Sequence, residues 1–261
     1  MSNDAIALVC AAHSVVGRRK NNQDALLVRA HLGLFAVADG MGGYAGGEIA
    51  SATVITALDD FMSRIHVDAD GTWPVRARRA LGPLEAVVDA ALRIADREVQ
   101  ARRTGVLARM GSTAVVALFR DRRLVVGNVG DSRLYRLRGD LEQLTADHSV
   151  AAELERGGMA AADVAPAFLA CLTRAIGMPG SAEPDLVTSP VQAGDTYLLC
   201  SDGLWGALDD ATIAAHLGQA EVERACATMI AAAYAAGSTD NITAVVIRAE
   251  ATSAQLSGRM P

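Results

Sequence analysis

The sequence contains four apolar, strand-like runs that each meet an aspartate beside a turn residue. They are LFAVADG, which ends at Asp39-Gly40, VVGNVGDS at Asp131, TYLLCSDG at Asp202-Gly203, and STDNITAVVI, which starts near Asp240. A strand that carries a carboxylate to its end, next to a residue that lets the chain turn, directs oxygen atoms toward a shared point. Carboxylates that lie close together repel, and a hard divalent cation is the usual counter-charge. The pattern therefore predicts a site for more than one Mg²⁺ or Mn²⁺ ion.

The composition is that of a folded protein with a large apolar core. Of the 261 residues, 51% are hydrophobic and 21% are charged, and the formal net charge is -6. This is material for one large or two small domains. The negative charge argues against a nucleic-acid partner, which calls for a basic surface.

The cysteine pattern and the N-terminus point to no oxidising compartment and no membrane. No C-x-x-C spacing occurs, and we expect all four cysteines to be buried free thiols. They are Cys10, Cys171, Cys200 and Cys226. The opening MSNDAIALVC lacks a basic region, and no run approaches the roughly 18–20 apolar residues that span a bilayer. We therefore expect a cytoplasmic protein with no membrane contact.

Hydrophobic periodicity predicts strand clusters separated by helices. Strands are expected at 5–13, 25–30, 33–39, 111–119, 122–129, 132–138, 195–201 and 242–248. Helices are expected at 54–65, 83–103, 149–157 and 222–233, with a surface loop at 66–81. This order does not alternate strand and helix, so it favours an α+β layered sandwich of antiparallel sheets covered by helices.

Taken singly, the aspartates are weak signals. An Asp-Gly after a strand is most often a simple turn, and Asp131 or Asp240 has an equally ordinary reading as a turn or cap residue. Two further segments strengthen the case. One is RKNNQD, where a basic pair stands ahead of Asp24; the other is ADGMGGYAGGE at 38–48, whose glycines permit close backbone approach to a ligand.

With these segments in view, the sequence resembles the metal-dependent protein phosphatases of type 2C, in their bacterial branch. The matching pieces follow one another in the family's order over nearly the whole chain. They are RKNNQD (19–24), VADGMGG (37–43), GSTA (111–114), GNVGDSRLYR (127–136), LTADHS (144–149), LTRAIG (172–177), LLCSDGLW (198–205) and STDNIT (238–243). The resemblance implies a four-layer α-β-β-α sandwich of two antiparallel sheets flanked by helices, with a small flap subdomain.

The resemblance also implies residue roles. Asp39 would bridge two Mn²⁺ or Mg²⁺ ions, and the carbonyl of Gly40 would bind the second ion. Asp202 and Asp240 would complete the shell of the first ion, and Asp24 would hold a water bound to a metal. Asp131, with Asp202, would bind a third and weaker ion, and Arg19 would grip the substrate phosphate. The positive charge of two divalent cations would equal the negative charge of four aspartates. Arg19 would then remain available to bind the negatively charged phosphate.

The implied activity is hydrolysis of phosphoserine and phosphothreonine in proteins. A hydroxide between two cations roughly 3.5–4 Å apart would attack phosphorus directly, without a covalent intermediate. Two positions depart from the family's usual pattern. Gln23 stands where glutamate is usual, and Met41 stands where eukaryotic relatives often have a histidine. Because Met41 donates no proton, the general acid is unassigned.

Several other charged residues have structural readings that we favour over catalytic ones. His148 is expected to be a structural loop histidine, and Arg174 to orient the 147–190 segment or pair with an acid. Arg18 is the weaker competitor of Arg19, because the spacing to Asp24 favours Arg19.

We expect one catalytic domain over 1–250, a flap subdomain at about 147–190 and a flexible tail at 251–261. The implied partners are phosphorylated proteins, among them a cognate Ser/Thr kinase and its substrates, and we expect a monomer. Two other functions stay open from the residues: a non-catalytic phosphoprotein-binding relative, and a two-metal nuclease or phosphodiesterase. The first would need damaged metal ligands, and the second a basic, aromatic groove.

Overall fold

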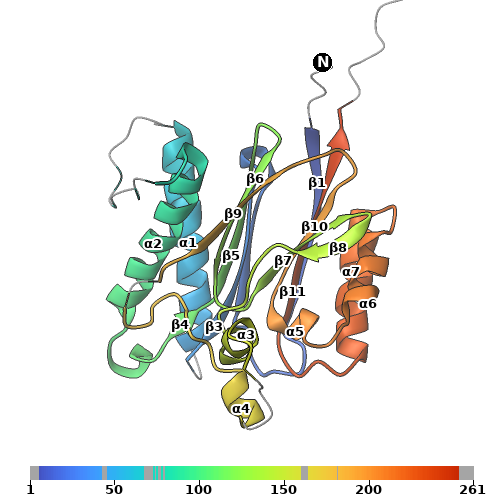
Figure 1. Cartoon of the computed structure of the whole chain (residues 1–261). Coiled ribbons are helices and arrows are strands. Elements are labelled where there is room, and N and C mark those ends of the chain that lie inside the picture. Colours follow the sequence, from blue (N-terminus) through green and yellow to red (C-terminus); the bar gives the residue numbers. More distant parts are fainter. Residues whose placement is uncertain are drawn as a thin grey trace, which may run out of the picture.

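Two antiparallel β-sheets lie face to face, and helices cover the outer face of each sheet (Figure 1). The computed structural model describes residues 6–42, 46–67, 73, 75, 78, 80–159, 164–180 and 182–252. The four layers are visible in Figure 1 as the α1 and α2 pair, the two sheets, and the α6 and α7 pair. The predicted α-β-β-α sandwich is therefore confirmed.

The first sheet has six strands and carries the earlier part of the chain. Its order is β2-β3-β5-β6-β9, and β4 pairs with β3 outside this path. Its strands are β2 (Asp24–Arg29), β3 (Leu34–Met41), β4 (Gly111–Ser112), β5 (Ala114–Arg120), β6 (Arg123–Val129) and β9 (Asp185–Pro190). The β5–β6 hairpin turns at Asp121 and Arg122, whose φ angles are 50° and 60°. Positive φ at both positions gives the two-residue turn that matches strand twist.

The second sheet has five strands and joins both ends of the described chain. Its order is β1-β11-β10-β7-β8. The strands are β1 (Ile6–Val15), β7 (Arg133–Arg138), β8 (Asp140–Gln143), β10 (Thr196–Cys200) and β11 (Ile242–Ala251). The first strand pairs with the last along ten residues, from Ile6 opposite Ala251 to Val15 opposite Ile242. This pairing brings the 16–24 segment beside the 238–242 segment.

The helices pack on the outer faces or lie near the ends of the sheets. The longer ones are α1 (Gly46–Val67), α2 (Pro83–Arg102), α6 (Asp210–Leu217) and α7 (Val222–Ala235). The short ones are α3 (Val150–Arg156), α4 (Pro166–Leu169), α5 (Asp202–Trp205), and the 3₁₀ turns η1 (Ala30–Leu32) and η2 (Gly105–Leu107). Ser149 caps α3 by accepting the backbone N–H of Ala152, and Asp209 caps α6 by accepting that of Thr212.

Three apolar clusters hold the layers together. One lies between α1, α2 and the six-stranded sheet, one between the sheets, and one between the five-stranded sheet and α5–α7. Phe119 packs in the inter-sheet core, edge-on to Phe35 at 5.8 Å and to Tyr197 at 5.2 Å between ring centroids. The core forms because alternate strand residues face inward, as the periodicity predicts.

The structure differs from the expectation at two Asp-Gly pairs. Asp39 and Gly40 lie inside β3, which continues to Met41 and pairs with β4, so the expected turn there is wrong. Asp202 and Gly203 begin α5 instead of forming a turn. In both cases glycine is needed for close packing. A Cβ on Gly40 would lie 2.0 Å from the carbonyl oxygen of Gly47, and one on Gly203 would lie 1.9 Å from that of Asn241.

Other differences concern short elements and the cysteines. Periodicity missed β8, β9, α4, α5 and α6, which are too short or too mixed in composition to show a clear repeat. Of the expected surface loop 66–81, Trp73 packs edge-on against Phe61 and Val75 is buried. Cys200 and Cys226 are buried, but Cys10 is half-buried and Cys171 is exposed, so the prediction of four buried thiols is wrong. Residues 253–261 of the expected tail lie outside the described residues.

In the described part of the chain, none of the helices combines the length and the apolar composition that a membrane crossing requires.

Candidate metal centre

Five aspartates that are far apart in the sequence meet at one end of the sandwich. Asp24 begins β2 and lies opposite Asp39 of β3 in the strand register. Asp131 follows β6, Asp202 follows β10, and Asp240 precedes β11. The charges of Asp24, Asp131, Asp202 and Asp240 all act on Asp39. Asp202 and Asp240 also line a cavity of about 340 Å³. The structure therefore brings together all of the carboxylates that the sequence singled out, beside an open space.

The backbone of Asp39 is fixed by the GSTA segment. Its N–H donates to Thr113 Oγ1 at 2.9 Å, and its carbonyl accepts the Thr113 N–H at 2.8 Å and the Ser112 hydroxyl at 3.0 Å. Thr113 Oγ1 also lies 2.7 Å from Ser132 Oγ, one residue after Asp131. Thr113 thus ties Asp39 to the Asp131 turn. The sequence contained this signal in its GSTA motif, but no role was assigned to the threonine.

Asp24 is held by hydroxyls from the other sheet. Its Oδ2 accepts from Ser201 Oγ at 2.7 Å and from Thr243 Oγ1 at 2.6 Å. Its Oδ1 is buried and has no hydrogen-bond partner among the described residues. Asn241 links the start of β11 to the segment before Asp24, because its amide donates to the carbonyls of Val16 and Asn21 at 2.9 Å each. Sequence reasoning missed Ser201, Thr243 and Asn241, although Ser201 and Asn241 are each adjacent to a predicted ligand.

The turn that carries Asp131 is braced on two sides. Gly130 adopts φ of 105°; its N–H donates to His148 Nδ1 at 3.1 Å, and its carbonyl accepts the His148 N–H at 2.9 Å. His148 Nε2 lies 3.0 Å from Asp185 Oδ2, so the ring donates there. On the other side, Trp205 Nε1 donates to the Asp131 carbonyl at 3.0 Å. The structural reading of His148 is supported: it is buried and positions the turn.

Three arginines outside the cluster also form structural contacts. Arg174 pairs with Asp185 at 2.7 Å, which is the acid partner that the sequence left unnamed. Arg133 pairs with Asp147 at 2.7 Å and stacks on the Trp205 ring, 3.5 Å from its centroid. Arg18 lies 5.6 Å from the centroid of the Tyr234 ring. Arg19, by contrast, reaches into the aspartate cluster.

Burial and mutual repulsion make ionisation of the cluster unfavourable. Burial is the largest cause that raises the pKa of Asp24, Asp39, Asp131 and Asp202, and neighbouring carboxylates raise each further. The pKa of Asp24 is raised to about 6 and that of Asp131 to about 7. A hydrogen bond with Asp39 partly offsets the rise in the pKa of Asp202. The four residues as a whole are only half-buried. Their pKa values rise nevertheless, because protein atoms and other carboxylates surround the carboxyl groups themselves.

Asp240 differs from the others because both of its oxygens are engaged. Oδ2 accepts from Arg19 Nη2 at 2.6 Å, and Oδ1 accepts the backbone N–H of Asn241 at 2.8 Å. The residue expected to grip phosphate therefore pairs with a residue expected to bind metal. In keeping with this, no group of three or more His, Cys, Asp or Glu side chains within the described residues has the geometry to hold a metal ion as it stands.

The donor set nevertheless suits hard divalent cations. All of the candidate ligand atoms are oxygens, which Mg²⁺ and Mn²⁺ prefer. Asp24 Oδ1 and Asp202 Oδ1 are buried without a hydrogen-bond partner in the described chain. Buried polar atoms of this kind normally have a partner. Cations placed here would satisfy these atoms and remove the repulsion, so the residues present fit the group.

Comparisons with known proteins agree with the fold and the site. Residues 10–242 match the family model described as protein phosphatase 2C. The chain is 36% identical over 252 residues to the serine/threonine protein phosphatase PstP of Mycobacterium tuberculosis, covering 94% of this chain and 46% of PstP. It is 32% identical over 219 residues to the serine/threonine phosphatase stp of Listeria innocua, covering 81% and 82% of the two chains. The chain thus spans about half the length of the mycobacterial relative.

Solved structures show the same fold. The crystal structure of the PstP catalytic domain in complex with two manganese ions superimposes with a TM-score of 0.78 at 36% identity, covering 94% of this chain and all of that one. A match over most of the chain, in sequence and in fold, shows the family. The chain belongs to the protein phosphatase 2C family.

Proposed function

We propose that this protein is a Mn²⁺- or Mg²⁺-dependent phosphatase of phosphoserine and phosphothreonine in proteins. One observation carries the proposal: five aspartates from separate strands and turns crowd one end of the sandwich, two of them have buried oxygens without a hydrogen-bond partner among the described residues, and Arg19 reaches into the cluster. The names of the relatives and the manganese ions in the PstP structure support it. We assign residues 1–250 to one catalytic domain, and we confine the flap expected at about 147–190 to the residues before β9, because β9 belongs to the six-stranded sheet.

In this proposal each residue of the aspartate cluster has its own role. Asp39, Asp202, Asp240 and the Gly40 carbonyl would hold the cations, Asp24 would orient a water through Oδ1, and Asp131 would add a weaker site. The cations supply Lewis acidity, which lowers the pKa of water toward neutrality and offsets charge on the phosphoryl group.

In this proposal Arg19 exchanges its ion pair with Asp240 for contacts to the substrate phosphate. Its side chain is 55% exposed and its link to Asp240 is a surface ion pair, which contributes about 0–1 kcal/mol. Arg19 would therefore leave Asp240 at little cost if that carboxylate held a cation. Its guanidinium then presents a planar fork of donors that suits two phosphate oxygens.

The partners and compartment form a finer part of the proposal. Phosphorylated proteins follow from the activity, and we propose a cognate Ser/Thr kinase and its substrates among them. We propose that the protein acts as a monomer in the cytoplasm. Relatives named as bacterial serine/threonine phosphatases support the choice of substrate class.

The test is hydrolysis of p-nitrophenyl phosphate and of a phosphothreonine peptide. Mn²⁺ should stimulate both reactions and EDTA should abolish them. Asp39→Asn and Asp202→Asn should each lower kcat/KM by about 100-fold or more, because each removes a charge that holds the cations. Full activity in both variants would refute the assignment.

Two controls separate the other functions. Preferential cleavage of bis-p-nitrophenyl phosphate would indicate a phosphodiesterase. Calorimetry that detects no Mn²⁺ binding would indicate a non-catalytic relative.

A further inference from the structure

The loop between β1 and β2 carries three consecutive basic residues beside the aspartate cluster. They are Arg18, Arg19 and Lys20, and all three are exposed. The chain has a formal net charge of -6, so three adjacent positive charges at this place oppose the general charge of the protein. Arg19 is the residue expected to bind phosphate, and its two neighbours have no role in that assignment.

The backbone of this loop is held at both ends. A single side-chain amide, that of Asn241, donates to the carbonyls of Val16 and Asn21 at 2.9 Å each. Gly17 adopts φ of 60°, and a Cβ there would lie 2.0 Å from the carbonyl oxygen of Asp240. The loop thus packs directly on the backbone of a candidate ligand, which only glycine permits. It is a fixed support for the side chains that it presents.

Asp240 places the loop at the border of the cavity beside the aspartate cluster. Its carboxylate accepts from Arg19 Nη2 at 2.6 Å, and Asp240 also lines the cavity of about 340 Å³. Arg18 and Lys20 stand directly before and after Arg19 in the chain. An extended peptide advances by roughly 3.3–3.6 Å per residue. The residues next to a phosphoresidue bound at this site therefore come within reach of these long basic side chains.

The charges of Arg18 and Lys20 are not neutralised by the rest of the protein. Among the described residues, neither side chain takes part in an ion pair. Arg18 lies over the ring of Tyr234, which is itself 49% exposed, and a ring contact leaves the guanidinium charge in place. Helix α7 beside the loop has no acidic residue from Arg224 to its end at Ala235.

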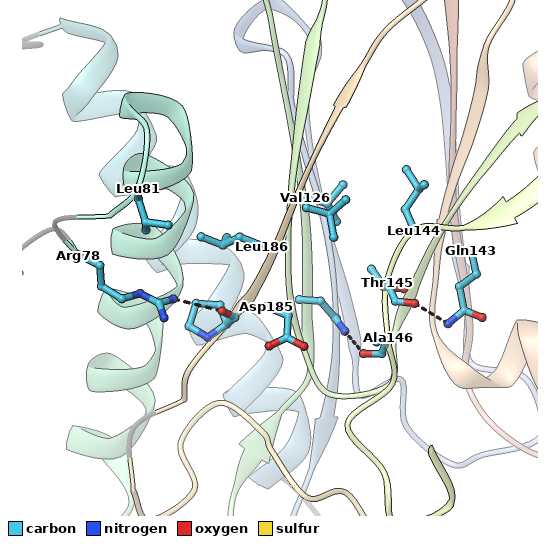
Figure 2. A pocket seen from close by; sticks show the side chains of 12 residues that line it. Arg78, Leu81, Val126, Gln143, Leu144, Thr145, Ala146, Asp185 and Leu186 are labelled. Atoms are coloured by element: carbon cyan, nitrogen blue, oxygen red, sulfur yellow. Dashed lines mark hydrogen bonds between the residues drawn. The ribbon is translucent and has the colours of Figure 1, made fainter. Parts of the chain in front are cut away.

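A second hollow in the described structure shows the opposite situation. It has a volume of about 640 Å³ and lies beside β9, and none of the five clustered aspartates lines it (Figure 2). The basic residue in its wall is Arg78, which donates to the Pro184 carbonyl at 3.2 Å, drawn as a dashed line in Figure 2. Its Nε also donates to Asp89 at 2.8 Å. That arginine already has partners, whereas Arg18 and Lys20 keep their charge for a ligand.

We propose, on the basis of the phosphatase activity proposed above, that Arg18 and Lys20 select phosphoprotein segments with acidic residues directly beside the phosphoresidue. Arg19 would bind the phosphate, and the two flanking cations would bind carboxylates of the neighbouring substrate residues. Complementary charge of this kind favours the encounter with acidic segments and disfavours basic ones. The substrate class of the site is therefore an acidic phosphorylated segment.

The test compares two phosphothreonine peptides on the Mn²⁺-loaded protein. One peptide carries glutamate on both sides of the phosphothreonine, and the other carries glutamine there, so the two differ in charge and hardly in shape. We expect kcat/KM to be about fivefold higher for the acidic peptide, because each exposed contact between opposite charges contributes up to about fivefold. Added salt should shrink this preference, because exposed charges are screened.

The key variant combines Arg18→Gln with Lys20→Gln. We expect the two peptides to differ by less than about twofold in kcat/KM on this variant, because both flanking charges are gone. The ratio compares two substrates on one protein, so a general change in activity cancels.

The matched control combines Arg64→Gln with Arg224→Gln, which removes two other exposed arginines and gives the same net charge. Arg64 lies near the end of α1 and Arg224 in the first turn of α7. Arg224 is about 15 Å along its helix from Tyr234. The preference for the acidic peptide should persist in this control.

A binding measurement separates this inference from the proposed activity. Phosphonate analogues of both peptides, in which a methylene group replaces the ester oxygen, are labelled and their Kd is measured by fluorescence anisotropy. The acidic analogue should bind the wild-type protein about fivefold more tightly, and both analogues should bind the double variant of Arg18 and Lys20 about equally. If the wild-type protein hydrolyses neither phosphopeptide, the proposed function fails, and the Kd ratio still decides between the two analogues.

Three results would overturn the selection of acidic segments. The first is a wild-type Kd ratio close to one. The second is a preference that survives the loss of both Arg18 and Lys20. The third is an equal loss of preference in the control variant, which would assign the effect to net charge instead of the loop.

Discussion

At the scale of single residues, the hydroxyls do as much as the carboxylates to define the site. Thr113 holds the backbone of Asp39 and contacts Ser132, while Ser201 and Thr243 hold Asp24. Like charges would otherwise drive these carboxylates apart. The hydroxyls keep them in place without adding a positive charge that would compete with cations.

Substitution of Thr113 tests this role. Thr113→Val keeps the side-chain shape but leaves the Asp39 N–H without its acceptor, which costs about 1–3 kcal/mol of stability. We expect kcat for p-nitrophenyl phosphate to fall by about tenfold, because a displaced ligand perturbs the reacting geometry. Thr113→Ser keeps the hydroxyl and should retain most of the activity. Similar losses in both variants would show that packing of the methyl group, and not the hydrogen bond, is what matters.

At the scale of elements, the segment between Ser149 and β9 touches the six-stranded sheet where Ile176 forms an antiparallel bridge with Ser112 of β4. It carries α3 and α4, and it exposes Met159 at 59% and Phe168 at 57%. Its start is anchored beside the metal centre through His148, and its end joins β9 next to Asp185. The last six residues of the expected 147–190 flap form β9 and belong to the sheet. A flap that selects phosphoproteins would therefore be confined to the residues before β9.

Exchange of residues 150–172 for the matching segment of the Listeria relative tests that selection. We expect the ratio of kcat/KM values between two phosphopeptides to change by about tenfold, because specificity resides in contacts outside the reacting group. Hydrolysis of p-nitrophenyl phosphate, which is too small to reach these contacts, should stay within about twofold. An equal loss on both kinds of substrate would show that the segment supports the metal site instead.

At the scale of the whole molecule, the aspartate cluster reduces the stability of the cation-free protein. The folded-state pKa of Asp131 is about 7, well above the ordinary value of 3.8, mainly because of burial. Between these values the folded state binds more protons than the unfolded state, so this contribution makes stability fall as pH rises. Cations should remove the penalty, because they favour the ionised form.

Urea unfolding in EDTA at pH 5.0 and 7.5 tests this balance. Asp131→Asn should be more stable than the wild type, and its advantage should grow by up to about 3 kcal/mol from pH 5.0 to 7.5. Comparison with the variant removes the opposing contribution of His148, whose pKa is lowered by burial. Saturating Mn²⁺ should reduce or reverse the advantage. An advantage that does not depend on pH would contradict the raised pKa of Asp131.

The amino-acid sequence determined the fold class, the family and the carboxylates of the site. Those inferences rest on local information: alternation of apolar residues, aspartates at strand ends, and motifs such as VADGMGG and STDNIT. Helices α2 and α7 and the long strands show clear periods because one face of each is buried against a large core.

Only the tertiary structure showed which residues from different motifs contact one another. The pairing of Arg19 with Asp240 joins residues 221 positions apart, and that of His148 with Asp185 joins a loop to a strand that no periodicity revealed. The place of β9 at one end of the six-stranded sheet depends on its pairing with β6, a strand far earlier in the chain. Hydrogen bonds and sheet edges are set by packing across the whole chain, whereas a strand or helix repeat is set by a few consecutive residues.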